Sequence, residues 1–363
     1  MLFNLRRGLG FAVACLLPFS VLVAQDASNS IKVEWTKIDA SADVGFRGMS
    51  TVGKNIVWVS GSRGTVLRSI NGGKTFENVS VPDSEKLDFR DVHAFDKDNA
   101  VVMNAGFPGV FFRTSDGGKS WKKVYDDQRE KIFFDAMDFW DQKNGVAFGD
   151  PIDGRMVILL TNDGGNRWKE IDQSSQPKME EGQAGFAASG TCLVAGGKAS
   201  ILVATGGGTE EQDLSKSKII TSYDRGKSWK NLEVPIPRGP SAGMFSLVAM
   251  NAKEMVAVGG DYRKPDDVKG NCALTRDGGK TWRAIKKQNP SGFRSCVAFN
   301  GSQKKPVLIA SGTNGVDLSL DSGATWKRID QHPSNVIQFS SDGKTIYSAG
   351  PKGSLFVGRI VEK

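Results

Sequence analysis

One short motif recurs along the chain and limits its possible folds more than any other feature. The motif runs from a Ser or Thr through an Asp or Asn and a glycine to an aromatic residue, as in Thr114–Trp121. Six copies occur, and their third residues are 45, 47, 61, 53 and 44 positions apart. Repeats of about 40–50 residues made of short strands are typical of propeller blades. The third residues are Asn71, Asp116, Asp163, Asp224, Asp277 and Asp321, and five copies end in Trp121, Trp168, Trp229, Trp282 or Trp326.

The chemistry of the motif predicts a capped turn. The side chain at its third position can accept hydrogen bonds from N–H groups of its own turn, and the glycine two residues later permits a positive φ. The Trp begins the next strand and can bury its ring between neighbouring blades. This is the Asp-box pattern of sialidase-type and related propellers. We therefore expect these residues to serve the fold, and their spacing does not match a calcium loop.

Each repeat is predicted to contain four strands, with the motif as the turn between the third and the fourth. In the second repeat these strands are residues 91–95, 100–103, 110–114 and 121–124. The end of the chain has three more strand-like segments with no motif after them, and residues 33–38 have the pattern of the missing fourth strand. We expect this N-terminal strand to join the last blade, because closing the ring removes an open sheet edge. The predicted fold class is all-β, a seven-bladed β-propeller, with blades numbered here in chain order.

The first residues have the pattern of an export signal. Two arginines precede an apolar stretch that is interrupted by Pro18, and Ala24 offers a small residue for cleavage. A membrane anchor needs about 20 uninterrupted apolar residues, and a lipoprotein signal ending at Cys15 would leave too short an apolar stretch. We expect residues 1–24 to be a signal peptide for the general or the twin-arginine route. Residues 25–363 would then form one propeller domain, a periplasmic or secreted monomer without a membrane anchor.

Composition argues against several kinds of site. The chain has 2 His, and its 48 Lys and Arg against 40 Asp and Glu include no long basic run. A His-rich metal centre is excluded by count, and no nucleic-acid partner, metal or cofactor is expected. Cys192, Cys272 and Cys296 lie in apolar strand-like runs and are predicted to be buried small hydrophobic residues rather than a disulfide framework. His93 is interpreted as a residue of the channel rather than a catalyst.

Function is expected on the face away from the motif turns. The strand that lines the central channel begins with a Phe-Arg pair in blades 1, 2 and 6, which gives Arg47, Arg90 and Arg294, and blade 3 has Asp135 there. We expect the three arginines to converge at the channel mouth, where a guanidinium group can bind a carboxylate through two hydrogen bonds. The alternative is that they pair with local carboxylates such as Asp91 or Asp135 and only hold blades together.

The loops between the second and third strands also differ between blades. They are short in blades 1, 2, 6 and 7, where Arg63 lies at one tip, and long in blades 3, 4 and 5. The long loops add Asp150, Asp261 and Tyr262 to the same face. The predicted binding residues are therefore Arg47, Arg63, Arg90, Arg294, Asp135, Asp150, Asp261 and Tyr262, and no catalytic residue is assigned.

Three features resemble the photosystem II stability/assembly factor family. They are the Phe-Arg-Gly start at 46–48, the run SGSRGTVLR at 60–68 and the repeated DGGK(S/T)W turns. The resemblance covers the whole chain after the signal. It implies an exported seven-bladed propeller that acts as an assembly chaperone without known catalysis and binds its partner through an arginine patch, here Arg47, Arg90, Arg294 and Arg63. The expected partner is an envelope protein or another carboxylate-bearing ligand, and a glycan is possible.

A sialidase-like glycoside hydrolase is the alternative function. Sialidases use an arginine triad for the sugar carboxylate and a tyrosine nucleophile helped by an acid, and Tyr262 beside Asp261 is the tyrosine expected on the correct face. Sialidases usually have six blades, however, and this sequence lacks a clear Arg-Ile-Pro start motif. Similar chains are sometimes named oxidoreductases, but no nucleotide fingerprint, redox cysteine pair or metal cluster supports that activity.

Overall fold

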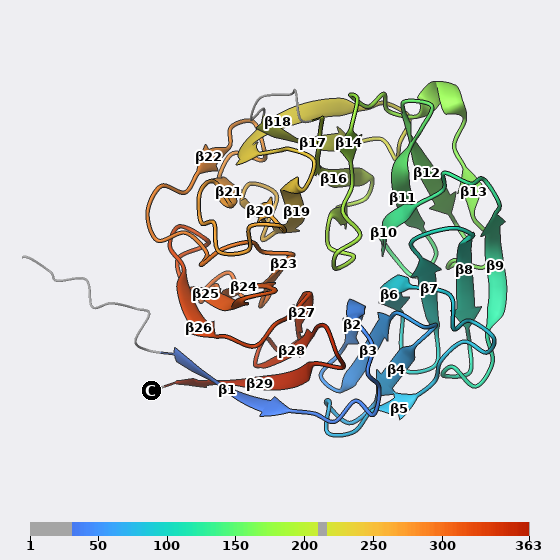
Figure 1. Cartoon of the computed structure of the whole chain (residues 1–363), viewed down its shortest axis with the longest axis horizontal. Coiled ribbons are helices and arrows are strands. Elements are labelled where there is room, and N and C mark those ends of the chain that lie inside the picture. The colour runs from blue at the N-terminus through green and yellow to red at the C-terminus, as the bar shows by residue number, and fades with distance from the viewer. Residues whose placement is uncertain (1–30, 210–215, 363) are drawn as a thin grey trace, which may run out of the picture.

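The strands form a ring of antiparallel sheets around a central axis (Figure 1). The computed structural model describes residues 31–209 and 216–362. Over these residues the strands make up seven blades, as the sequence predicted. Blades 4 and 5 share one nine-stranded sheet, because Gly206 pairs with Gly243 across their boundary. A side chain at Gly243 would come within 2.4 Å of the Gly206 Cα, so only glycine permits this contact.

Each blade runs from an inner strand to an outer one. Blade 1 is β2 (Phe46–Val52), β3 (Ile56–Gly61), β4 (Val66–Ser69) and β5 (Glu77–Asn78). Blade 2 is β6 (Phe89–Ala94), β7 (Ala100–Asn104), β8 (Gly109–Thr114) and β9 (Lys122–Asp127), and blade 3 is β10 (Phe134–Phe139), β11 (Gly145–Ile152), β12 (Arg155–Thr161) and β13 (Lys169–Glu170). Blade 4 is β15 (Leu193–Gly196), β16 (Ser200–Gly207), β17 (Lys216–Ser222) and β18 (Lys230–Pro237), with β14 (Gln183–Ala184) also paired to β16 and a 3₁₀ turn η2 (Gln173–Ser175) before it.

The other three blades follow the same order. Blade 5 is β19 (Ala242–Ala249), β20 (Met255–Asp261), β21 (Cys272–Thr275) and β22 (Arg283–Ala284), and blade 6 is β23 (Cys296–Phe299), β24 (Leu308–Gly312), β25 (Gly315–Ser319) and β26 (Lys327–Asp330). Blade 7 is β27 (Val336–Phe339), β28 (Thr345–Ala349), β29 (Leu355–Glu362) and the N-terminal β1 (Ile31–Lys37).

The predicted closure of the ring by the N-terminal strand is confirmed. β1 pairs antiparallel with β29 from Ile31 opposite Glu362 to Lys37 opposite Phe356. Trp35 lies opposite Gly358, where an added side chain would meet the Trp ring at 2.7 Å. The proposed signal peptide, residues 1–24, lies outside the described residues, so the division at residue 25 stays a prediction.

The motif turns carry the hydrogen bonds that their chemistry predicted. In the second copy, Ser120 N donates to Asp116 Oδ1 (2.9 Å), and Ser120 Oγ donates to the other carboxylate oxygen (2.6 Å). These hydrogen bonds lower the pKa of Asp116 to about 2. Gly118, at a φ of 83°, donates its N–H to Thr114 Oγ1 (2.9 Å). The third residues of the other copies, Asn71, Asp163, Asp224, Asp277 and Asp321, likewise accept the N–H of the residue four positions later.

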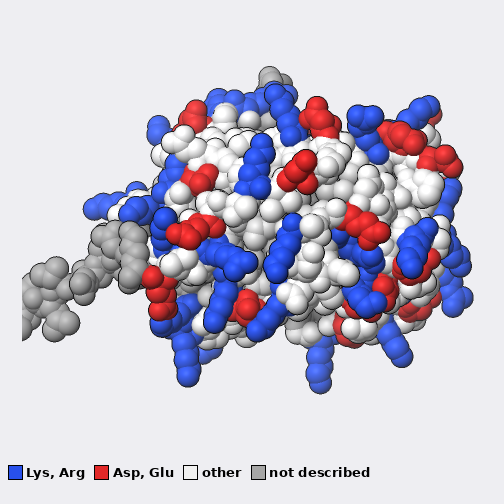
Figure 2. Space-filling view, turned by 90° about the horizontal axis from the view of Figure 1, so that it is seen from below, with Lys and Arg blue, Asp and Glu red and all other residues white. Residues whose placement is uncertain are grey.

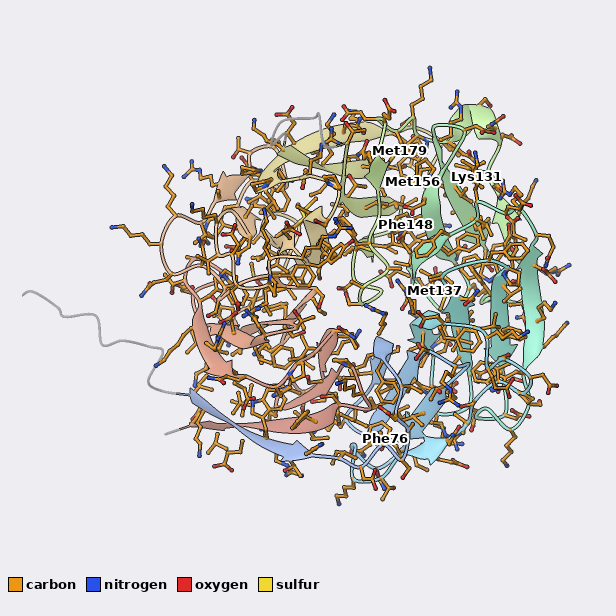
Figure 3. All side chains as sticks on the ribbon, in the orientation of Figure 1. Phe76, Lys131, Met137, Phe148, Met156 and Met179 are labelled. Atoms are coloured by element: carbon orange, nitrogen blue, oxygen red, sulfur yellow. The ribbon has the colours of Figure 1, made fainter. Side chains whose placement is uncertain are left out.

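Polar side chains join the inner strands of adjacent blades. In each case a side chain of one inner strand accepts a backbone N–H of the next inner strand, which satisfies groups that the ring would otherwise bury unpaired. The pairs are Ser50 with Ala94, Asp91 with Met137, Asp138 with Ala195 and Ser246 with Val297. Apolar side chains fill the space farther out, as Phe148 and Met156 do on the side of blade 3 that faces blade 4 (Figure 3).

The cysteines fit the prediction. Cys192, Cys272 and Cys296 are free and buried, and burial raises the pKa of each thiol. No helix among the described residues is long and apolar enough to cross a membrane. Seen from below in Figure 2, the rim of the ring carries Lys and Arg side chains with Asp and Glu interspersed among them.

Candidate binding site at the channel mouth

A cavity of ≈ 460 Å³ lies at the end of the channel away from the motif turns. It is lined by residues at the starts of the inner strands and in the loops between second and third strands, which share one end of every blade. One part of the lining is cationic and another is aromatic, so the cavity can contact charge and apolar surface at once. The charged and aromatic lining residues are Arg47, Arg90, Asp150, Phe133, Phe186, Phe245, Tyr262 and Phe293.

Bulges at the starts of the inner strands aim side chains into this cavity. The register of β2 shifts between Phe46 and Gly48, which leaves Arg47 as the extra residue. The same register shift makes Arg90 the extra residue of a bulge in β6 and Phe245 the extra residue of a bulge in β19. A bulge re-aims the side chain of its extra residue, and all three of these side chains line the cavity.

The two arginines of the cavity differ in their partners. Arg90 Nε donates to Asp88 Oδ2 (2.7 Å), and its guanidinium lies 5.7 Å from the centre of the Phe133 ring. Arg47 is half-buried and has no ion pair or hydrogen bond from its side chain to the part of the chain that the structure describes. Burial and then the charge of Arg90 lower the pKa of Arg47, and Asp88 opposes them. A half-buried guanidinium without a partner favours binding of an external anion.

Arg294 does not join this pair, so the expected cluster of three arginines is corrected to two. Its N–H donates to the Gly259 carbonyl (2.9 Å), just as Phe46 N–H donates to the Gly350 carbonyl (3.0 Å) of the preceding blade. Arg294 therefore occupies the buried position of Phe46, and the next residue, Ser295, takes the position of Arg47 and lines the cavity.

The Arg294 side chain is instead closed inside blade 6. Both it and Asp317 are 0% exposed, and Arg294 Nε donates to Asp317 Oδ2 (2.6 Å). Its Nη1 donates to Asn314 Oδ1 (2.6 Å). The alternative of pairing with local carboxylates thus describes Arg294, with Asp317 as its partner.

Two acidic residues, Asp135 and Asp150, belong to blade 3, which follows the blades of Arg47 and Arg90 around the ring. Asp150 lines the cavity, and its Oδ1 accepts the N–H of Gly185 (3.0 Å). Burial raises the pKa of Asp150 to about 6. Asp135 is 0% exposed, and neither of its carboxylate oxygens has a donor within hydrogen-bonding geometry among the described residues. Burial, followed by the charge of Asp150, raises the pKa of Asp135 well above its usual value, although Arg90 offsets part of this.

The remaining predicted residues are placed apart from the arginines or at the edge of the cavity. Tyr262 lines the cavity, is 45% exposed and meets the Phe245 ring edge-on at 6.3 Å. Asp261 accepts hydrogen bonds from Ser241 Oγ (2.7 Å) and Arg263 N (2.9 Å), and does not line the cavity. Arg63 is exposed at its loop tip, outside the cavity lining. That these three residues bind a ligand stays a prediction.

Three aromatic residues that line the cavity, Phe186, Phe245 and Phe293, form an aromatic wall that the sequence analysis did not predict. Phe186 stacks on Phe245 with ring centres 3.8 Å apart, and Phe293 meets Phe245 edge-on at 4.7 Å. These residues come from segments far apart in the chain that meet only when the ring closes. The repeat offered one usable signal, because Phe245 occupies the same bulge position as Arg47.

A second cavity, of ≈ 280 Å³, lies in the channel and contains His93 and Asp138. Burial lowers the pKa of His93 to about 4 and raises that of Asp138 to about 6, and His93 Nδ1 is 3.9 Å from Asp138 Oδ1. Both Asp138 oxygens accept backbone N–H groups. His93 is therefore placed in the channel as predicted, and no group of three potential metal ligands occurs in residues 31–209 and 216–362.

Comparison with known proteins gives a family resemblance over the first part of the chain. Residues 26–130 match the family model described as photosynthesis system II assembly factor YCF48. The resemblance to the photosystem II assembly factors is confirmed. A comparison with curated protein sequences gave no match.

Solved propellers share the fold over nearly the whole chain. A structure described as YCF48 bound to D1 peptide has a TM-score of 0.62 at 18% identity, covering 91% of this chain and 97% of that one. YCF48 from Cyanidioschyzon merolae gives 0.62 at 16% identity, with 90% and 98% covered. The WD40 repeats of RRP9 give 0.61 at 11% identity, with 92% and 98% covered. Identities this low show that the fold is shared and do not show a shared function.

Proposed function

We propose that the protein is an exported propeller that acts by binding, and that it recognises a carboxylate-bearing segment of a partner protein in the cavity at the channel mouth. The observation that carries this proposal is Arg47, a half-buried guanidinium without a partner among the described residues, beside Arg90 in the same cavity. The YCF48 structure with a D1 peptide supports a protein segment as the ligand class. The signal-like pattern of residues 1–24 supports a periplasmic or secreted location.

The cavity suits one end or one acidic side chain of a polypeptide. Its volume, ≈ 460 Å³, falls within the roughly 300–1,000 Å³ that is usual for small-ligand sites. Arg47 would hold the carboxylate, with Arg90 adding positive potential next to it. The aromatic wall of Phe186, Phe245 and Phe293 would cover an apolar side chain beside that carboxylate.

An affinity capture from an envelope extract tests the proposal. The mature protein is compared with an Arg47→Ala/Arg90→Ala variant and with a Lys74→Ala/Lys119→Ala variant, which removes the same charge from exposed positions in the motif turns. Each protein that is captured is then identified, and peptides from its acidic segments and its C-terminus are titrated directly.

The expected result is a partner held by the wild type and the lysine variant and lost by the arginine variant. One of its peptides should also bind through a carboxylate that cannot be replaced by an amide. Retention of the same proteins by all three would contradict the site, provided that circular dichroism shows all three to be folded.

A further inference from the structure

The cavity has a second charged pole that the proposed function does not use. Asp150 lines it on blade 3, with Asp135 directly behind. We propose that the ligand carries a cationic group as well as a carboxylate, and that Asp150, backed by Asp135, binds this ammonium or guanidinium group. The inference deepens the proposed function and rests on it, since Arg47 is taken to hold the carboxylate.

Asp135 is directed toward the cavity by its place in the strand. The register of β10 shifts between Phe134 and Ala136, so Asp135 is the extra residue of a bulge. Its counterparts in the other bulged inner strands, among them Arg47 and Phe245, line the cavity. Asp135 differs because a backbone segment at Gly185 covers it.

The segment at Gly185 contacts the carboxyl groups of both Asp135 and Asp150. A side chain on Gly185 would come within 2.6 Å of Asp135 Oδ2, and the N–H of Gly185 donates to Asp150 Oδ1 (3.0 Å). Gly185 also lines the cavity. The buried carboxyl group of Asp135 therefore lies against the backbone of Gly185, a residue that itself lines the cavity.

The charges around the cavity show which groups still need a partner. Arg90 already has an ion-pair partner, because its Nε donates a hydrogen bond to Asp88 Oδ2. Arg47 on blade 1 and the Asp135–Asp150 pair on blade 3 have no opposite charge bonded to them among the described residues. A buried carboxyl group without a cation avoids its desolvation cost by holding a proton, and two adjacent carboxyl groups can share one. A ligand ammonium would replace that proton, which passes to solvent.

The surface around Arg47 and the Asp135–Asp150 pair restricts the chemistry of the ligand further. The stacked Phe186 and Phe245 rings and Phe293 form an apolar surface in the same cavity. A chain end with a terminal carboxylate, an apolar last side chain and a basic residue next to it would satisfy all three features. We therefore use N-acetyl-lysyl-phenylalanine as the probe.

Three forms of this probe separate the two poles in calorimetric titrations. The first has a free amine and a free carboxylate, the second is acetylated on the lysine amine, and the third ends in an amide. For the wild type we expect acetylation to weaken binding by roughly tenfold or more, because a charged hydrogen bond is lost. The Asp150→Asn variant should bind the free and acetylated probes equally, and Lys119→Ala should behave as the wild type does.

The outcomes separate the two proposals. Equal affinity of the wild type for the free and acetylated probes, with the amide bound more weakly, would overturn the cation site and leave the arginine site standing. Equal affinity for the acid and the amide would overturn the carboxylate site. If none of the three probes binds at millimolar concentration, this ligand class is overturned. The capture experiment from the envelope extract then still tests whether Arg47 and Arg90 bind a partner protein. The probe comparison needs only the wild type, so it holds even if Asp150→Asn does not fold.

Discussion

Arg47 and Arg294 lie in blades 1 and 6 of the same ring and have opposite surroundings. Arg294 is fully enclosed and meets an equally enclosed Asp317, with Asn314 as a further acceptor. Arg47 is half-buried in a cavity and has no acceptor among the described residues. The difference shows how a fold uses one residue type in two ways: a charge with its partner built in holds a blade together, and a charge without one is available to a ligand.

The largest effect is expected from Arg294→Ala. Removing one member of a buried ion pair leaves the other charge without compensation, so the free energy of unfolding should fall by about 3–5 kcal/mol. Urea unfolding followed by tryptophan fluorescence measures this change. A double variant, Arg294→Met/Asp317→Leu, replaces the pair with apolar groups and should lose much less. Wild-type stability of Arg294→Ala would show that the pair does not hold blade 6.

Arg47→Ala should have the reverse profile. Because the Arg47 side chain has no hydrogen-bond or ion-pair partner among the described residues, the free energy of unfolding should change by no more than about 0.5 kcal/mol. Affinity for the carboxylate probe should fall by roughly 10- to 100-fold, as expected for loss of a hydrogen bond to a charged group. Calorimetric titration and urea unfolding of the same sample test both parts. If Arg47→Ala lost as much stability as Arg294→Ala, the assignment of Arg47 to binding and of Arg294 to stability would be contradicted.

The carboxyl pair of the cavity predicts a pH dependence of stability. Burial raises the pKa of Asp150 to about 6 in the folded protein, above the value of 3.8 for an ordinary Asp. The folded state therefore keeps a proton that the unfolded chain releases, so this contribution is complete below pH 3.8 and is lost as the pH rises through 6.

The melting temperature of the wild type should therefore fall between pH 5 and pH 7 more steeply than that of Asp150→Asn. The difference between the two proteins is the quantity to measure, because His93, with a pKa of about 4, acts in the opposite direction in both. Parallel curves would mean that Asp150 does not titrate in this range.

The smallest effect is expected on the face of the motif turns. Thr114→Val removes the buried hydroxyl that accepts the N–H of Gly118 (2.9 Å), which should cost about 1 kcal/mol of stability. Affinity for the carboxylate probe should stay at the wild-type value, since this turn lies at the other end of blade 2. Thermal unfolding and probe titration of this variant check that binding belongs to the channel mouth. Weaker probe binding by Thr114→Val would contradict this prediction, because it would show that a motif turn affects binding at the channel mouth.

The sequence predicted the ring well because its signals are local and repeated. The six capped turns and the closing strand follow from side chains within a few residues of each other, and β1 pairs along its whole length with β29. The site was harder, because a shift of one residue in strand register decides which side chain enters the cavity. The Phe-Arg pair of blade 6 looks like that of blade 1, yet Arg294 takes the position of Phe46.

The aromatic wall could not be predicted for a different reason. Phe186, Phe245 and Phe293 come from three blades, and no pattern within a single blade joins them. The surroundings of Asp135 and Asp150 depend likewise on the segment at Gly185, which folds back over these two carboxyl groups. Contacts of this kind follow from how the ring closes, which local sequence patterns do not specify.

The most direct test of the account is the ratio of affinities for the acid and amide forms of the probe. It is measured in the wild type, in Arg47→Ala and in Arg294→Met/Asp317→Leu. We predict a preference for the acid of roughly tenfold or more in the wild type, the same preference in the double variant, and none in Arg47→Ala. A preference that survives in Arg47→Ala would contradict the assignment of the carboxylate to the channel mouth.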